Sequence, residues 1–223
     1  MKRVLVFAVH PDDETLGAGG ALLRFKSEGK EIFWAVMTSM SPELGFSADR
    51  IEQRKKEIVT VHDHYKFSQR FEMNYPTTQL DTESLRQITG DVAKIIKDCA
   101  PDTVIIPHKY DAHSDHNVAF KALIGLSKTF RYPSIENVWA METLSESNFA
   151  LYGPQEVFLA NTYVNISNFL EKKIEIMKCY DSEILPHPFP RSTQSIKALA
   201  TLRGSESGFE HAEAFYSVKS ILR

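Results

Sequence analysis

Residues 4–14 read VLVFAVHPDDE, an apolar run that ends directly in an imidazole and three carboxylates. A second apolar run, TVII over residues 103–106, precedes a second polar cluster, HSDH over residues 113–116. Short apolar runs of this kind are typical of buried strands. We therefore expect each polar cluster just beyond the carboxyl end of a strand, where open α/β sheets bind their ligands.

The pattern around these two clusters predicts an α/β fold, a Rossmann-like three-layer sandwich with a mostly parallel, doubly wound sheet, because strand and helix patterns alternate. In the common strand order of such a sheet the first and fourth strands are neighbours, so both clusters are expected to share one crevice. The strand patterns cover residues 2–9, 32–37, 70–73 and 103–106, and the helix patterns cover residues 16–26, 50–64, 84–97 and 117–130.

The second half of the chain is less regular. Strand patterns cover residues 137–142 and 156–164, a helix pattern covers residues 166–180, and the proline-rich residues 185–190 predict a loop. Because no linker or internal repeat separates the halves, we expect one domain over residues 1–223.

The composition of the chain bears on its binding partners and its compartment. The net charge is −3 and no block of lysine and arginine occurs, which argues against nucleic-acid binding. No apolar stretch approaches the ~20 residues of a membrane helix. Two cysteines far apart in sequence do not make a disulfide framework, so a reduced cytoplasm is the expected compartment. The sequence leaves a homo-oligomer open.

The residue types in the two clusters indicate a metal site. A catalytic zinc ion takes histidine nitrogens and a carboxylate and keeps one position for water. The simplest assignment takes His10 and Asp13 from the first cluster and His116 from the second, for one Zn²⁺ per chain. Iron, cobalt or manganese could replace zinc at such a site.

The remaining polar residues suggest catalytic roles. Zinc lowers the pKa of a bound water to about 7, so the adjacent carboxylate of Asp12 is expected to take its proton as general base. If the second cluster is helical, His113 projects to the same side as His116 and could stabilise an oxyanion or protonate a leaving amine. Asp115 could fix the tautomer of His113.

Two other interpretations compete for the first cluster. Acidic residues at positions 12–14 could simply favour the N-terminus of a helix, which we prefer for Glu14. The glycines of residues 15–20, TLGAGG, suggest a dinucleotide site, but the carboxylates before them would repel a pyrophosphate. We expect these glycines to allow close packing of the first helix on the sheet.

The two clusters together resemble a known family, the PIG-L or LmbE-like zinc-dependent N-acetylglucosamine deacetylases. The first family motif stands here as HPDDETLGAGG over residues 10–20, and the second, His-x-Asp-His, as residues 113–116. The resemblance extends to about residue 145 and is looser beyond it.

The resemblance implies a hydrolase that removes the N-acetyl group from an N-acetylglucosamine-type sugar or glycoconjugate. It implies the same zinc ligands, with Asp12 as base and His113 at the oxyanion or leaving amine. Arg54 matches an Arg-x-x-Glu pattern of the family and is either a substrate contact or part of a surface ion pair. Glu142 and Arg203 are weaker candidates for substrate binding.

Two other functions remain open at this stage. A metal-dependent hydratase or lyase acting on a small carboxylic acid could use the same scaffold. It needs extra cationic groups for the substrate carboxylates, which Arg50, Arg54, Lys109 and Arg203 could supply. A metal- or sugar-binding protein without catalysis is disfavoured, because Asp12 and His113 would then have no evident role.

Overall fold

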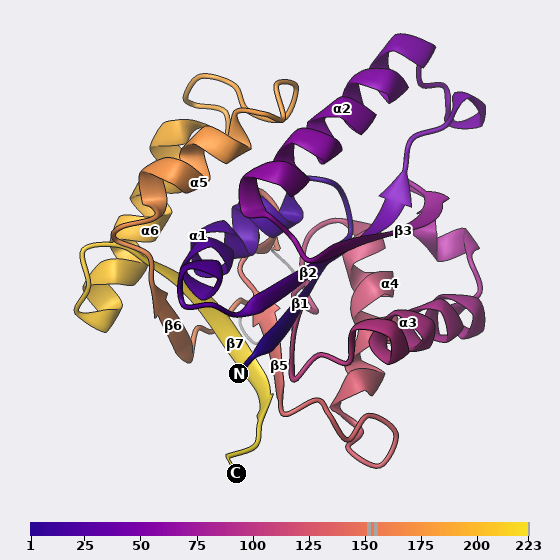
Figure 1. Ribbon diagram of the computed structural model, residues 1–223. Helices are drawn as coiled ribbons and strands as arrows, with labels where there is room; N and C mark the ends of the chain where they lie inside the picture. The colour runs from indigo at the N-terminus through magenta and orange to yellow at the C-terminus, as the bar shows by residue number, and fades with distance from the viewer. Residues whose placement is uncertain (151–152, 154–155, 223) are drawn as a thin grey trace.

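The computed structural model describes residues 1–150, 153 and 156–222, in which one seven-stranded sheet lies between two layers of helices (Figure 1). The strand order is β3-β2-β1-β4-β5-β7-β6; the first five strands are parallel, and β7 is antiparallel to both of its neighbours. This is the expected α/β fold class. The strands are β1 (Arg3–Ala8), β2 (Glu31–Ser39), β3 (Gln69–Pro76), β4 (Thr103–Ile106), β5 (Asn137–Met141), β6 (Thr162–Asn165) and β7 (Ala212–Ser220).

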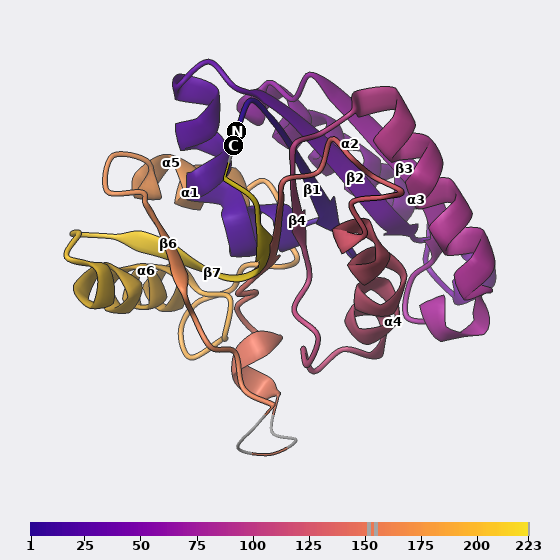
Figure 2. The ribbon, with the colours of Figure 1, turned by 90° about the horizontal axis from the view of Figure 1, so that it is seen from below.

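The helices divide between the two faces of the sheet. Helices α1, α2, α5 and α6 pack on one face, and α3 and α4 pack on the other (Figure 1). Figure 2 shows α1, α5 and α6 on one side of the sheet and α3 and α4 on the other. Short 3₁₀ helices lie in the connections. The α-helices are α1 (Asp13–Ser27), α2 (Ala48–Tyr65), α3 (Leu85–Cys99), α4 (Ser114–Leu123), α5 (Leu170–Met177) and α6 (Thr193–Ser207); the 3₁₀ helices are η1 (Pro42–Leu44), η2 (Leu80–Thr82), η3 (Ile124–Ser127) and η4 (Ser147–Phe149).

Strand β1 lies in the interior of this sheet and is buried on both faces. Val4, Val6 and Ala8 join the core under α1 and α2, whereas Leu5 and Phe7 join the core under α3 and α4. A parallel strand covered by helices on both sides has no solvent face, which is why its sequence is continuously apolar.

The pairing of β1 with β4 brings the two polar clusters together. The register aligns Val4 with Thr103 and Val6 with Ile105 in parallel, so both strands end at the same edge of the sheet. The prediction from the common strand order is therefore confirmed.

Both helices that follow these strands begin earlier than predicted. Helix α1 starts at Asp13 instead of residue 16, and α4 starts at Ser114 instead of residue 117. The sequence pattern placed each start near the first apolar residue, but acidic side chains in a first turn interact favourably with the helix dipole. The polar clusters thus form the N-terminal turns of these helices.

The C-terminal half differs more from expectation. Strand β6 is shorter than the pattern over residues 156–164, because Val157 and Leu159 lie outside the sheet and are exposed. The helix predicted over residues 166–180 is confined to α5. Helix α6 and strand β7 were not predicted, and β7 lies between β5 and β6, where antiparallel pairing with both strands defines it.

The glycines of α1 allow the close packing that was expected of them. A Cβ on Gly17 would lie 2.7 Å from Sδ of Met141 in β5, and one on Gly20 would lie 2.7 Å from Cβ of Ile166. Both distances are shorter than real Cβ contacts, so larger residues would push α1 away from its neighbours.

The described helices and the two cysteines can also be compared with what a membrane span or a disulfide requires. None of the helices in residues 1–150, 153 and 156–222 combines the length and apolar character needed to cross a membrane. Cys99 is buried and Cys179 is half-buried, and both are free thiols.

Candidate metal centre and active-site pocket

A cavity of about 500 Å³ opens beside the loops that follow β1, β2 and β3. Its lining includes His10, Asp12 and Asp13 from the first cluster and His113 from the second. His116 and Asp115 are fully buried. The structure therefore brings both clusters to one site.

Three of these side chains form a group that could hold a metal ion. The ligand atoms of His10, Asp13 and His116 all lie within 4.8 Å of one another. Nδ1 of His116 lies 2.8 Å from an Asp111 carboxylate oxygen, so we assign the ring proton to Nδ1 and the lone pair to Nε2. Nε2 lies 3.3 Å from Asp13 and, within the described part of the chain, is buried without a hydrogen-bond partner. A buried, unpartnered nitrogen lone pair beside a carboxylate fits a metal ion.

The electrostatics of this group favour a positive charge. Burial opposes ionisation, but His116 and His10 together lower the pKa of Asp13 to about 2. Burial also disfavours a charged imidazole, yet Asp13 and Asp111 raise the pKa of His116 well above its usual value. A divalent cation at the same point would take the place of that proton.

Asp111 is a site residue that the sequence analysis missed. Its carboxylate accepts hydrogen bonds from His116 Nδ1, from the Ser147 hydroxyl at 2.6 Å and from the backbone N–H of His108 at 3.2 Å. A carboxylate that orients a metal-binding histidine is common at metal centres. The available signal was an acidic residue just two positions before His113.

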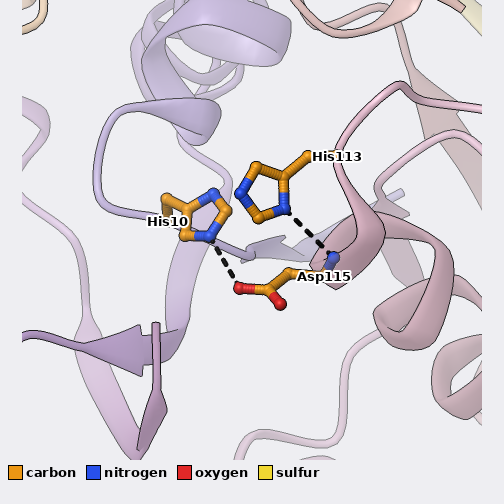
Figure 3. A group of neighbouring side chains, drawn as sticks. All are labelled: His10, His113 and Asp115. Atoms are coloured by element: carbon orange, nitrogen blue, oxygen red, sulfur yellow. Dashed lines mark hydrogen bonds and ion pairs between the residues drawn. The ribbon is translucent and has the colours of Figure 1, made fainter. Parts of the chain in front are cut away.

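A second, overlapping group contains His10, His113 and Asp115 (Figure 3). The Asp115 carboxylate already accepts hydrogen bonds from the backbone N–H groups of Thr78 at 2.7 Å and Leu80 at 3.0 Å, and lies 3.0 Å from His10 Nε2. These contacts occupy most of its lone pairs, so the group with Asp13 and His116 is the better metal site. Because Asp115 engages Nε2 of His10, the Nδ1 atom of His10 is the nitrogen that remains for a metal ion.

The contacts of Asp115 and His113 differ from expectation. The Asp115 carboxylate orients His10 rather than His113, because the first turn of α4 directs it toward the loop after β3. His113 is instead held by the backbone N–H of Asp115, which donates to Nδ1 at 3.1 Å. The ring proton of a neutral His113 therefore resides on Nε2. Burial, and then the nearby His10, lower the pKa of His113 and favour that neutral form.

Asp12 lines the pocket in an unusual backbone conformation. It is the N-cap residue of α1, with φ 138° and ψ −27°, and its side chain makes no capping hydrogen bond. A residue other than glycine pays about 1–3 kcal/mol for such a conformation, and functional sites are where these residues cluster. Burial, and then the charge of Asp13, raise the pKa of Asp12 well above its usual value.

Glu14 stands in the first turn of α1, but it is not a solvated member of a charge cluster. It is fully buried and accepts hydrogen bonds from Thr15 Oγ1 at 2.7 Å, Tyr180 Oη at 2.9 Å and the backbone N–H of Asp12 at 3.2 Å. Burial raises the pKa of Glu14 to about 7.

Arg54 lines the pocket, yet its guanidinium is engaged by the protein. It donates to the carbonyl oxygen of Pro11 at 2.6 Å, pairs with Glu57 at 3.0 Å and contacts Glu183. Its side chain is 6% exposed. The ion-pair alternative is therefore the one observed, although the pair is buried and does not lie on the surface.

Glu142 and Arg203 are not brought to this pocket. They pair with each other through two contacts of 2.8 and 2.5 Å. Both line a much smaller cavity of about 20 Å³ beside α1, α6 and β7. Their position does not support the substrate contacts expected of them.

The sequence of this chain is similar to a protein family and to a protein that are both described as removing acetyl groups. The model of the PIG-L family, GlcNAc-PI de-N-acetylase, matches residues 5–126. A diacetylchitobiose deacetylase from Thermococcus kodakarensis is 22% identical over 234 residues, covering 99% of this chain and 85% of that protein.

Two solved structures share the fold over nearly their whole length. The conserved protein TT1542 from Thermus thermophilus is 25% identical with a TM-score of 0.79, covering 100% of this chain and 97% of that one. GalB, the 4-carboxy-2-hydroxymuconate hydratase from Pseudomonas putida, is 17% identical with a TM-score of 0.72, covering 100% and 98%. Because the family match spans more than half of the sequence, this chain belongs to the PIG-L family.

Proposed function

We propose that this protein is a metal-dependent deacetylase that hydrolyses the acetamide of an N-acetylglucosamine-type sugar or glycoconjugate, releasing acetate and a free amine. The observation that carries the proposal is Nε2 of His116, which is buried, has no hydrogen-bond partner among the described residues, and lies beside His10 and Asp13 at a large pocket. Membership of the PIG-L family and the similarity to a diacetylchitobiose deacetylase support this substrate class.

The metal would be held by His10, Asp13 and His116, as one zinc ion per chain. When bound, zinc would supply a Lewis acid that activates water and polarises the amide carbonyl. Asp111 and Asp115 would support this centre, because each carboxylate holds one of the two histidines.

Two side chains of the pocket are assigned roles in the reaction. Asp12 takes a proton from the attacking water, and its raised pKa makes it a stronger base than an exposed aspartate. His113 donates a hydrogen bond from Nε2–H to the oxyanion that forms as the amide carbonyl is attacked. Asp12 then passes the proton it took from water to the amine nitrogen, so that the C–N bond breaks and leaves acetate and the amino sugar.

The rest of the pocket supports a substrate larger than the reacting acetamide. One part of its lining is apolar and includes Met40, Phe46 and Ile51, from the segment between β2 and α2 and from α2 itself. Ligand pockets usually combine such a surface with a few fixed polar groups. We assign this surface to the group that the sugar carries.

The hydratase alternative is not favoured by the lining. It needs cationic side chains for the substrate carboxylates, but Arg54 and Arg191 both pair with Glu183. Among the described lining residues, this leaves Lys55 as the one cationic side chain without an ion pair. The similarity to a hydratase at 17% identity concerns the fold alone.

The test is the release of primary amine and acetate from a panel of N-acetylglucosamine derivatives by zinc-loaded protein. Aryl and alkyl glycosides belong in the panel beside free N-acetylglucosamine and diacetylchitobiose. Equal amounts of amine and acetate are expected from at least one compound, and Asp12→Ala should release both far more slowly. Absence of release from every compound, with zinc bound, would count against the proposal.

A further inference from the structure

One peptide unit of the pocket is held at both ends by buried ionisable side chains. The carbonyl oxygen of Pro11 accepts a hydrogen bond from Arg54 Nη1 at 2.6 Å. The N–H of the same peptide unit, which belongs to Asp12, donates to Glu14 Oε2 at 3.2 Å. Arg54 comes from α2 and Glu14 from the first turn of α1, so two elements hold this peptide from opposite ends.

This peptide directly precedes the strained φ of Asp12, which is 138°. A conformation that costs free energy persists only where the surroundings hold it in place. Rotation of the Pro11–Asp12 peptide would relax that angle, and it would also break both hydrogen bonds to buried groups, whose loss is costly.

We propose that Arg54 and Glu14 are positioning residues that clamp the Pro11–Asp12 peptide and thereby hold the base Asp12 in its strained conformation. The catalytic part of this inference rests on the proposed function, in which Asp12 takes the proton of the attacking water. Glu14 is fully buried, and in this proposal both residues affect the reaction through the position of Asp12.

The two arms of the clamp are joined to each other. The guanidinium of Arg54 lies 5.4 Å from the centre of the Tyr180 ring, and the Tyr180 hydroxyl donates to Glu14 Oε1 at 2.9 Å. Tyr180 is fully buried. Glu57 and Glu183 pair with the other nitrogens of Arg54, which fixes its orientation. Such mutual support is what a strained position requires.

Arg50 offers a matched control for Arg54. It lies one turn earlier on α2 and contacts the same two carboxylates, with Nη1 3.4 Å from Glu57 and Nη2 3.1 Å from Glu183. Arg50 is not part of the pocket lining and makes no contact with Pro11 among the hydrogen bonds of the described residues. Arg50→Met therefore removes one charge from this cluster and leaves the clamp in place.

The experiment compares Arg54→Met with Arg50→Met. We expect Arg54→Met to lower kcat about 100-fold, the scale of an ångström-sized misplacement, with KM and zinc content unchanged. Arg50→Met should leave kcat within about threefold of the wild type. A crystal structure of Arg54→Met should show the φ of Asp12 relaxed to a negative value, a readout that does not depend on activity.

A double-variant test separates positioning from general damage. If Arg54 acts through Asp12, adding Arg54→Met to Asp12→Ala should not lower the residual kcat further. An equal fall of kcat in both backgrounds would overturn the proposal. An unchanged φ at Asp12 in Arg54→Met would overturn it as well.

Glu14 provides an independent test if Arg54→Met does not fold. Glu14→Gln keeps an oxygen that can accept from Asp12 N–H and should retain most of kcat, whereas Glu14→Met should lose it. Equal kcat values for the two variants would overturn the clamp. A wild-type protein inactive on every panel compound would instead refute the proposed function, and the φ of Asp12 in the variant structures would still decide the clamp.

Discussion

Replacing Asp111 by asparagine should weaken zinc binding about tenfold while leaving the fold intact. The carboxylate lies 2.8 Å from His116 Nδ1 at a fully buried position. Hydrogen bonds to charged groups contribute about 1.5–3 kcal/mol and neutral ones about 1 kcal/mol, so the loss of charge costs about 0.5–2 kcal/mol. Each 1.4 kcal/mol corresponds to about a tenfold change in affinity.

Asp111→Ala should have a larger effect, because it removes the hydrogen bond as well as the charge. We expect its zinc affinity to fall about 100-fold, the upper end for residues that support a metal ligand. The Ser147 hydroxyl also loses its partner, so a fall of about 1–3 kcal/mol in the free energy of unfolding should accompany it.

Competition with a chromophoric zinc chelator measures these affinities, and urea unfolding measures stability. The matched control is Asp102→Asn, which alters a carboxylate at the opposite end of β4, where it accepts the backbone N–H of Arg3 at 3.1 Å. This control should bind zinc like the wild type. If both Asp111 variants also bind zinc with wild-type affinity, Asp111 does not support the metal centre and our assignment of His116 as a ligand loses its main support.

Three further outcomes are expected. Asp12→Asn should lower kcat by a factor of about 10²–10⁴, which is the usual contribution of a general base, while the zinc content measured by elemental analysis stays at one ion per chain. A near-normal kcat would contradict the assignment of Asp12 as the base. Gly17→Ala should lower the free energy of unfolding by about 1–3 kcal/mol, because the new Cβ would lie 2.7 Å from Met141 Sδ. Gly90→Ala, at an exposed helical position with open space around it, should instead raise the free energy of unfolding by about 0.5–1 kcal/mol. Equal effects of the two variants in urea denaturation would contradict this packing. Lys173→Met should lower the free energy of unfolding by about 3 kcal/mol in the same assay, because it leaves the buried Glu213 without the ammonium group now 2.7 Å away. A loss below about 1 kcal/mol would show that this ion pair contributes little to stability.

Much of the first half could be predicted from the sequence. Continuous apolar runs such as residues 4–9 indicated strands buried on both faces, and the spacing of helix patterns between them indicated parallel connections. Connections between parallel strands are short and right-handed, which leaves few possible strand orders. The neighbouring positions of β1 and β4 therefore followed from the sequence pattern alone. Because these two strands are neighbours, the sequence pattern alone predicts that the two polar clusters share one site.

The second half could not be predicted in the same way. Strand β7 is defined by antiparallel pairing with β5 and β6, and its sequence carries no strong signal of its own. The pairing of Glu142 with Arg203 likewise joins residues far apart in the chain. Contacts between distant segments depend on how the elements pack, which local patterns do not record.

By itself, the sequence determined five of the side chains that gather at the candidate site, since His10, Asp12, Asp13, His113 and His116 follow apolar strands in two short motifs. Only the tertiary structure decided how they are oriented: Asp111 holds His116, Asp115 holds His10, and Arg54 and Glu14 hold the peptide before Asp12. The physical reason is that burial makes each unpaired polar group costly, so most buried donors and acceptors find a partner within the protein. Those partners come from whichever elements packing brings near, and the order of residues along the chain does not specify them.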